Sequence, residues 1–188
     1  HGRMVLPEGK AVRVEEGQRY VFQSHYLNTS DHALLVRDLA WGRLSPPEEV
    51  QDWVAAFGFN NSGIQLPPQQ NSSDGFSCSF GTDVHVLSIA GHMHGYGLSM
   101  YGEQVNTSRS RIYDLPTWDP SWRDAPQISN FPGDGLFVAA TDGIEGHCSW
   151  YNSTDKPLGF PSEMCVLMGL AWPLEEAVAC DSFRDSPG

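Results

Sequence analysis

Two histidines near the middle of the chain, His92 and His94, form an H-x-H pair within the run VHVLSIAGHMHGYG (84–97). Side chains alternate between the faces of a β-strand, so residues two apart share a face, with Cα atoms about 6.5–7 Å apart. Two imidazoles at this spacing can bind one metal ion, and Gly91 and Gly95 leave space beside them. An H-x-H pair by itself is also compatible with two ordinary core or surface histidines.

A methionine, Met164, opens an apolar run and is followed directly by Cys165. Methionine commonly fills gaps in a core, so core packing is one interpretation of Met164. A disulfide at Cys165 would instead fix the segment and hold the thioether in place. Two imidazoles and a thioether favour copper, especially Cu(I), over zinc, calcium or magnesium. Three protein ligands also leave a coordination position open, as a catalytic metal requires.

Short strands are the elements expected to position these residues. The 19 Gly and 13 Pro are spread along the chain without a period, which indicates many turns and short strands. Strand-like runs are expected at 84–93, 98–101, 110–114, 136–140, 147–151 and 164–172. We therefore expect an all-β protein, an antiparallel jelly-roll-like β-sandwich.

The first part of the chain has weaker signals. Two short β-type runs are expected within 12–27 and another strand at 33–44. The best helix candidate is 47–57, which has acidic residues in its first turn and a small apolar face. His85 lies seven positions before His92, so strand alternation predicts a structural histidine on the opposite face. His147, which adjoins Cys148, could stand near a copper ion, although a loop histidine is the favoured interpretation.

Four cysteines and five glycosylation sequons indicate a secreted protein. An even number of cysteines without a C-x-x-C pair predicts two disulfides, for which the sequence alone allows three pairings. The cysteines are Cys78, Cys148, Cys165 and Cys180. N-x-S/T sequons occur at Asn28, Asn60, Asn71, Asn106 and Asn152. They predict N-glycosylation of a protein that is extracellular or in the secretory-pathway lumen, the alternative being a loop surface rich in Ser and Asn.

The charge of the chain excludes several functions. Its net charge is -12, with 23 acidic against 11 basic residues, so no basic surface for nucleic acid or anionic membranes is expected. No apolar run approaches the roughly 20 residues needed to span a bilayer. The sequence has no G-x-S-x-G, phosphate-loop, H-E-x-x-H or EF-hand pattern. The expected partners are a small-molecule or peptide substrate of unknown identity, or other extracellular glycoproteins.

Several motifs, in order, resemble the copper type II ascorbate-dependent monooxygenases, which include dopamine β-monooxygenase and peptidylglycine α-hydroxylating monooxygenase. The motifs are HVLSIAGHMH (85–94), CSWYNSTD (148–155), SEMC (162–165) and the final cysteine, Cys180. The resemblance covers about 76–181 and extends more weakly back to Tyr20. It implies a sandwich of eight or nine strands whose oxygen-binding copper is held by His92, His94 and Met164, with ascorbate as electron donor. It also implies the disulfides Cys148–Cys165 and Cys78–Cys180.

The same resemblance implies a division of the chain. Residues 1–66 would be terminal strands like the end of the family's N-terminal copper domain, and residues 67–188 would be the C-terminal copper domain. His25, in QSHY (23–26), resembles one ligand of a second, electron-relaying copper. The family's other two ligands there are an adjacent His-His pair, which this chain lacks. Either that pair lies N-terminal to His1, or the protein lacks the second copper.

The chain departs from the family where peptide substrates bind. Ala90, Val166 and Met168 stand where the peptide-hydroxylating members carry Arg, Asn and Tyr. No cationic anchor for a carboxylate remains, so a glycine-extended peptide is not expected as substrate. Two functions stay open: a monooxygenase that hydroxylates a C–H bond with O2 and ascorbate, or a non-catalytic extracellular copper-binding or structural glycoprotein that retains the fold.

Overall fold

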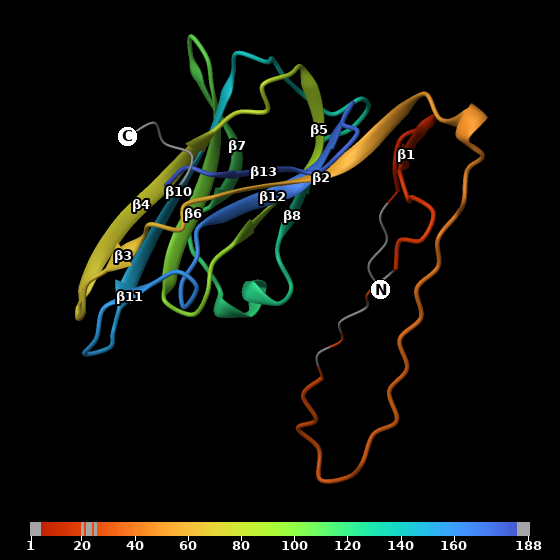
Figure 1. Ribbon diagram of the computed structural model, residues 1–188. Coiled ribbons are helices and arrows are strands. Elements are labelled where there is room, and N and C mark those ends of the chain that lie inside the picture. The colour runs from red at the N-terminus through yellow and green to blue at the C-terminus, as the bar shows by residue number, and fades with distance from the viewer. Residues whose placement is uncertain (1–4, 20, 22–23, 25, 184–188) are drawn as a thin grey trace.

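The expected all-β sandwich with two disulfides is confirmed (Figure 1). The computed structural model describes residues 5–19, 21, 24 and 26–183, so the predicted ligand His25 lies outside the described residues. One sheet has seven strands in the order β1-β2-β12-β5-β8, with β13 also paired to β2 and β9 to β5. A second sheet has the order β4-β10-β6-β7, and β11 pairs with β3.

The described elements are β1 (Lys10–Val12), η1 (Pro47–Glu49), β2 (Asp52–Asn60), β3 (Gln65–Leu66), β4 (Gln70–Cys78), β5 (Val84–His92), β6 (Gly97–Val105), β7 (Arg109–Leu115), η2 (Pro120–Arg123), β8 (Ile128–Asn130), β9 (Leu136–Val138), β10 (Gly143–Asn152), β11 (Leu158–Gly159), β12 (Val166–Trp172) and β13 (Val178–Asp181). Both η elements are 3-10 turns. No helix in the described part of the chain is long and apolar enough to cross a membrane. Most strand pairs are antiparallel, whereas β1 and β13 pair with β2 in parallel.

The core lies between the two large sheets and follows from strand alternation. In β10, every second side chain is buried, including Ile144, Cys148 and Trp150. From the facing sheet, Phe57 and Phe59 of β2 meet Phe80 with ring centroids about 5 Å apart. Side chains at alternate positions of each strand therefore meet in one layer, as expected for packed sheets.

Both disulfides connect one large sheet to the other, and both pairings that the resemblance implied are confirmed. Cys78 in β4 is bonded to Cys180 in β13, across 102 residues. Cys148 in β10 is bonded to Cys165, which directly precedes β12, across 17 residues. Each bond restricts the unfolded chain and fixes the separation of the two sheets.

The structure corrects the expected elements of the first part of the chain. The helix predicted at 47–57 is wrong. Pro47–Glu49 form a single 3-10 turn, and Asp52–Asn60 form the strand β2. Pairing of β2 with β12 and β13 outweighs the weak helical pattern of this short segment. The strand predicted at 33–44 is also wrong, and within 12–27 only the end of β1 is strand among the described residues.

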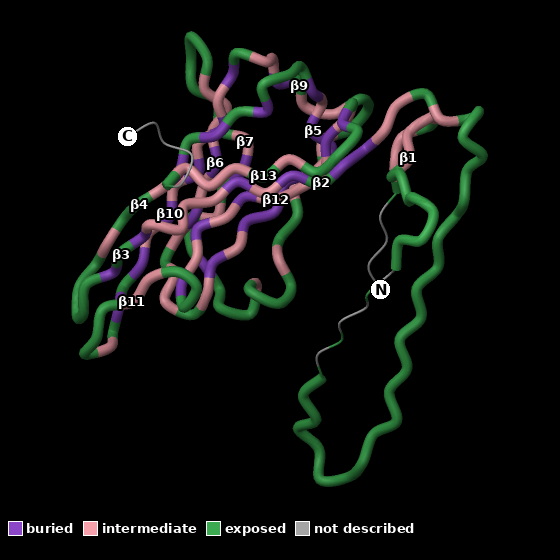
Figure 2. Tube along the Cα trace, in the orientation of Figure 1, coloured by how far each residue is buried: buried purple, intermediate pink, exposed green. Residues whose placement is uncertain are grey.

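The sandwich extends across the predicted division at 66/67, and that division stays a prediction from the resemblance. β2 is a central strand of the seven-stranded sheet, and β3 pairs with β11, so residues 52–66 belong to the same unit as 67–183. Every described residue from 12 to 49 is exposed, and this stretch forms a long excursion away from the sandwich (Figures 1 and 2). We call the described residues within 12–49 the exposed segment.

Strand alternation also fails at His85. A β-bulge at Leu87 shifts the register, so Leu170 pairs with Ser88 whereas the next residue, Ala171, pairs with Val86. The extra residue turns His85 to the same outer face of the sheet as His92, contrary to the prediction. His85 lies there as a packing residue, with its ring stacked on Trp172 at a centroid distance of 4.4 Å.

We expect removal of the Cys78–Cys180 bond to cost more stability than removal of the Cys148–Cys165 bond. The double alanine variants delete the same atoms, but the closed loops differ, 102 against 17 residues. Chain entropy then predicts losses in the free energy of unfolding of about 5 and about 3 kcal/mol. Urea unfolding of both variants measures the difference, and an equal or reversed order would contradict this account.

Candidate metal centre

The two imidazoles of the H-x-H pair converge at the end of β5. The Nε2 atoms of His92 and His94 are 3.1 Å apart, and the ring planes are nearly perpendicular at 89°. Two nitrogen ligands of one metal ion, each about 2.0–2.1 Å from it, can have this separation. Both side chains are half-buried. The geometry therefore fits two ligands of a single ion.

A hydrogen bond at Nδ1 of His94 leaves Nε2 of the same ring available for a metal. The Nδ1–H of His94 can donate to the carbonyl of Ser162, 2.9 Å away, which leaves the lone pair of Nε2 directed at His92. His92 has a backbone hydrogen bond to Arg123. Backbone partners of this kind orient imidazole ligands and select the tautomer that can bind a metal.

Burial also keeps His92 in the form that binds metals. Desolvation lowers the pKa of His92, and the neighbouring His94 lowers it further, against a smaller opposing effect of the hydrogen bond to Arg123. A neutral imidazole has the lone pair that a metal ligand needs, whereas the protonated ring does not. The local environment thus favours metal binding over protonation at neutral pH.

A buried carboxylate, Glu163, fixes the backbone that follows β5. Its side chain is fully buried. It accepts hydrogen bonds from the backbone N–H of His94 at 3.0 Å, the backbone N–H of Tyr96 at 2.8 Å and Nε1 of Trp150 at 3.2 Å. The carbonyl of His94 accepts a further bond from Nε1 of Trp118 at 2.9 Å. His94 is consequently held at both its backbone N–H and its carbonyl.

Glu163 belongs to the SEMC motif, but its position in the sequence does not predict a role at the metal centre. A lone glutamate normally indicates a solvated position, and only its place between Ser162 and Met164 distinguishes it. The structure shows that Ser162 and Glu163 both contact His94, so this segment and the histidines form one unit.

Met164 lies in the same unit. β12 and β5 are antiparallel, with Val166 opposite His92 and Met168 opposite Ala90. Met164 comes two residues before β12, at the end of the strand pair where β5 finishes with His92. Met164 is half-buried and precedes the disulfide-bonded Cys165. The chain thus brings the three predicted ligands to one end of the β5–β12 pair.

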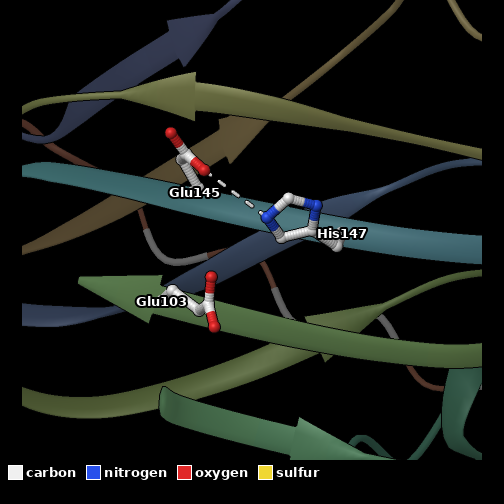
Figure 3. Close-up of side chains that lie close together, drawn as sticks. All are labelled: Glu103, Glu145 and His147. Carbon is white, nitrogen blue, oxygen red and sulfur yellow. Dashed lines mark ion pairs between the residues drawn. The ribbon is translucent and has the colours of Figure 1, made fainter. Parts of the chain in front are cut away.

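A second group of metal-binding residue types, Glu103, Glu145 and His147, lies on the outer face of the four-stranded sheet (Figure 3). His147 belongs to β10, so its prediction as a loop residue is wrong. Nε2 of His147 lies 3.5 Å from Glu145. Arg109 lies 3.2 Å from Glu103 and 2.5 Å from Glu145, and it lowers the pKa of Glu145. A cation would compete with this guanidinium, so the group fits a surface salt-bridge network.

The five sequons occupy different environments. Asn28, Asn71 and Asn106 are exposed, and Asn60 is half-buried at the end of β2. Asn152 is fully buried, and its Nδ2 donates to the carbonyls of Leu66 at 2.9 Å and Lys156 at 2.8 Å. A glycan on this nitrogen would have to displace both hydrogen bonds, so the burial of Asn152 disfavours the glycosylation that the sequon predicts. Asn152 instead stabilises a turn through Thr154.

Comparison of the sequence with protein-family models gave no match, and no curated protein matches it. The fold and the site therefore define the class on their own. It is a disulfide-bonded β-sandwich with two converging imidazoles and an adjacent methionine segment at the end of two central strands.

Replacement of Glu163 by glutamine is expected to weaken both the fold and metal binding. Glutamine has one carbonyl oxygen, so at least one of the three donors loses its acceptor, at a cost of about 1–3 kcal/mol in the free energy of unfolding. Loss of an orienting partner should lower copper affinity about 10–100-fold. Urea unfolding and Cu(I) competition titration measure both effects. Glu176→Gln, at an exposed glutamate, is the control and should change neither.

The lowered pKa of His92 predicts how the stability of the metal-free protein depends on pH. Between the lowered folded-state pKa and the unfolded value of about 6.5, the unfolded state binds more protons than the folded state. The contribution of His92 to stability should therefore be complete above about pH 6.5 and decrease as the pH falls through that window. In urea unfolding between about pH 5 and 7.5, the free energy of unfolding of His92→Asn should depend less on pH than that of the wild type. An unchanged slope in this variant would refute the assignment.

Proposed function

We propose that this chain is the copper-binding domain of a secreted monooxygenase that hydroxylates a C–H bond with O2 and ascorbate. The observation that carries the proposal is the 3.1 Å approach of the Nε2 atoms of His92 and His94, with His94 in contact with Ser162 and Glu163, which directly precede Met164. The motifs that contain these residues resemble the copper type II ascorbate-dependent monooxygenases. Two imidazoles with a thioether favour copper.

The residues of the chain have separable roles in this proposal. His92 and His94 would bind copper through Nε2, and Met164 would add the thioether. Glu163 is a positioning residue, because it holds the backbone of His94 and Tyr96. A Cβ added to Gly95 would meet nothing within 4 Å, so the side of the pair next to His94 is open. Copper bound here would supply the redox chemistry for O2 with electrons from ascorbate.

The electron balance makes the second predicted site important. Hydroxylation of R–H by O2 gives R–OH and water and takes up two electrons and two protons. One copper ion supplies one electron at a time, so the reaction needs a second donor. His25 is the residue proposed for a second, electron-relaying copper, which would also need an adjacent histidine pair from outside this chain.

The two disulfides fit an oxidising compartment, and three exposed sequons fit glycosylation there. These features support the proposal that the protein acts outside the cell or in the secretory-pathway lumen.

A second candidate function is a non-catalytic extracellular glycoprotein that retains the fold and the metal. The exposed segment favours it, because large apolar side chains stand in solvent there. Leu35 is 101% exposed, Trp41 90% and Val21 88%. Exposed apolar side chains gathered in one segment are typical of a surface that contacts another protein.

Cu(I) titration tests the metal centre. We expect one tightly bound copper per chain, with a sulfur ligand visible by X-ray absorption. His92→Ala and Met164→Ala should lose more than about 100-fold in affinity, since each removes a direct ligand rather than an orienting partner. His25→Ala should retain this copper, and His32→Ala, at an exposed histidine, is the matched control. Absence of tight copper from the wild type would refute the centre.

Oxygen consumption with ascorbate separates the two functions. The copper-loaded enzyme should consume O2 in the presence of ascorbate and substrate, and His92→Ala should not. Bound copper without substrate-dependent oxygen consumption would favour the non-catalytic glycoprotein.

A further inference from the structure

The strand register places one uncharged row of residues directly beside His92. Each member lies opposite the next across five neighbouring strands. Residues opposite each other in paired strands share a face of the sheet. We call this set the apolar row, and it runs from β13 through β2, β12 and β5 to β8. Its members are Ala179, Gly58, Met168, Ala90 and Ile128.

The apolar row lies on the face that carries His92 and not on the core face. Ala90 is two residues before His92 in β5, so their Cα atoms are about 6.5–7 Å apart on one face. The residue between them, Gly91, faces the core, since a Cβ there would meet Sδ of Met100 at 2.5 Å and Cε1 of Tyr113 at 2.7 Å. His92 and the apolar row therefore share the outer face.

Gly58 leaves an unexplained opening in this face. Glycine weakens the interior of a strand and usually indicates a bulge or the close approach of another group. The paired part of β2 runs without a register shift, and a Cβ added to Gly58 would meet nothing within 4 Å. Met168, directly opposite, is half-buried, and Ile128 at the end of the row is 60% exposed. The row thus has open space at Gly58 beside the half-buried Met168, whereas Ala90, next to His92, is buried with 7% of its surface exposed.

The charged groups near the apolar row are already paired. Arg123 and Asp124, on the loop beside His92, form an ion pair at 3.0 Å. At the other edge, the carboxylate of Asp181 accepts hydrogen bonds from the backbone N–H of Ser62 and Phe183. The nearest charged groups, Arg123, Asp124 and Asp181, therefore already have partners within the protein.

We infer that the apolar row holds an uncharged, apolar group of the substrate, and that this group carries the C–H bond to be hydroxylated. The inference rests on the proposed copper function and defines the substrate class of that site. A carboxylate or ammonium group placed on the row would lose hydration without gaining a partner, whereas an apolar group gains from leaving water. The reaction remains R–H to R–OH with one O2, two protons and two electrons from ascorbate.

Three probes that differ in charge but share a p-tolyl ring test the inference. They are 4-methylbenzyl alcohol, 4-methylbenzoate and 4-methylbenzylammonium. Ligand-observed NMR measures their dissociation constants on the copper-free protein, in about 1 M salt, where the Debye length is about 3 Å and the acidic surface is screened. Copper binding is measured separately by Cu(I) titration. The neutral probe should bind at least tenfold more tightly than either charged probe.

Two variants locate the binding. Gly58→Leu fills the opening and should weaken the neutral probe at least tenfold without changing copper affinity. Ser77→Leu, at an exposed strand position of β4 in the four-stranded sheet, is the matched control and should have no effect. Met168→Glu places an anion on the apolar row and should shift the preference to 4-methylbenzylammonium, which keeps the test decisive if Gly58→Leu fails to fold.

The outcomes separate the inference from the function on which it rests. Wild-type protein that binds no copper refutes the proposed function, whatever the probes do. If copper binds normally but the protein does not prefer the neutral probe, the substrate class is overturned. It is also overturned if the protein does prefer the neutral probe but neither the Gly58 nor the Met168 variant changes that preference. Sedimentation that shows a wild-type dimer abolished by Gly58→Leu would assign the apolar row to a second copy of the chain and also overturn it.

Discussion

The buried carboxylate of Glu163 is the interaction on which the arrangement of the site depends. A carboxylate without hydrogen-bond partners in a core would be strongly unfavourable, and Glu163 avoids this cost by accepting three N–H groups. Two of those donors belong to the backbone just after β5, where the strand ends and ladder bonds no longer satisfy it. The same contact thus stabilises the carboxylate and fixes His94.

The donor from Trp150 extends this constraint to the second sheet. Trp150 and Cys148 both lie in β10 and both point into the core, where one bonds Glu163 and the other Cys165. Residues 163 and 165 are therefore both attached to β10, and Met164 lies between two fixed neighbours. A thioether has three rotatable bonds, and anchoring the backbone on both sides reduces the conformations that it must lose on binding a metal.

The sequence predicted the features that depend on local pattern and missed those that depend on distant pairing. Alternation was enough to place β5 and His92 on it, whereas His94 lies just after the strand and is held toward His92 by its contacts with Ser162 and Glu163. The helix expected at 47–57 is not formed, because residues from Asp52 onward pair as β2 with β12 and β13. His85 was placed on the wrong face, because alternation cannot reveal the extra residue at Leu87. The sequon at Asn152 is a turn motif, since its amide faces the core.

The half-buried sequon at Asn60 affects how accessible the outer face around His92 is in experiments. Asn60 lies opposite Val166, which lies opposite His92, so the three residues form one line across the outer face. Two strand spacings, about 9–10 Å, separate the asparagine from the histidine. An oligosaccharide attached to Asn60 would cover the histidine pair and limit access to it. The expression host, which determines glycosylation, would then determine how accessible this face is.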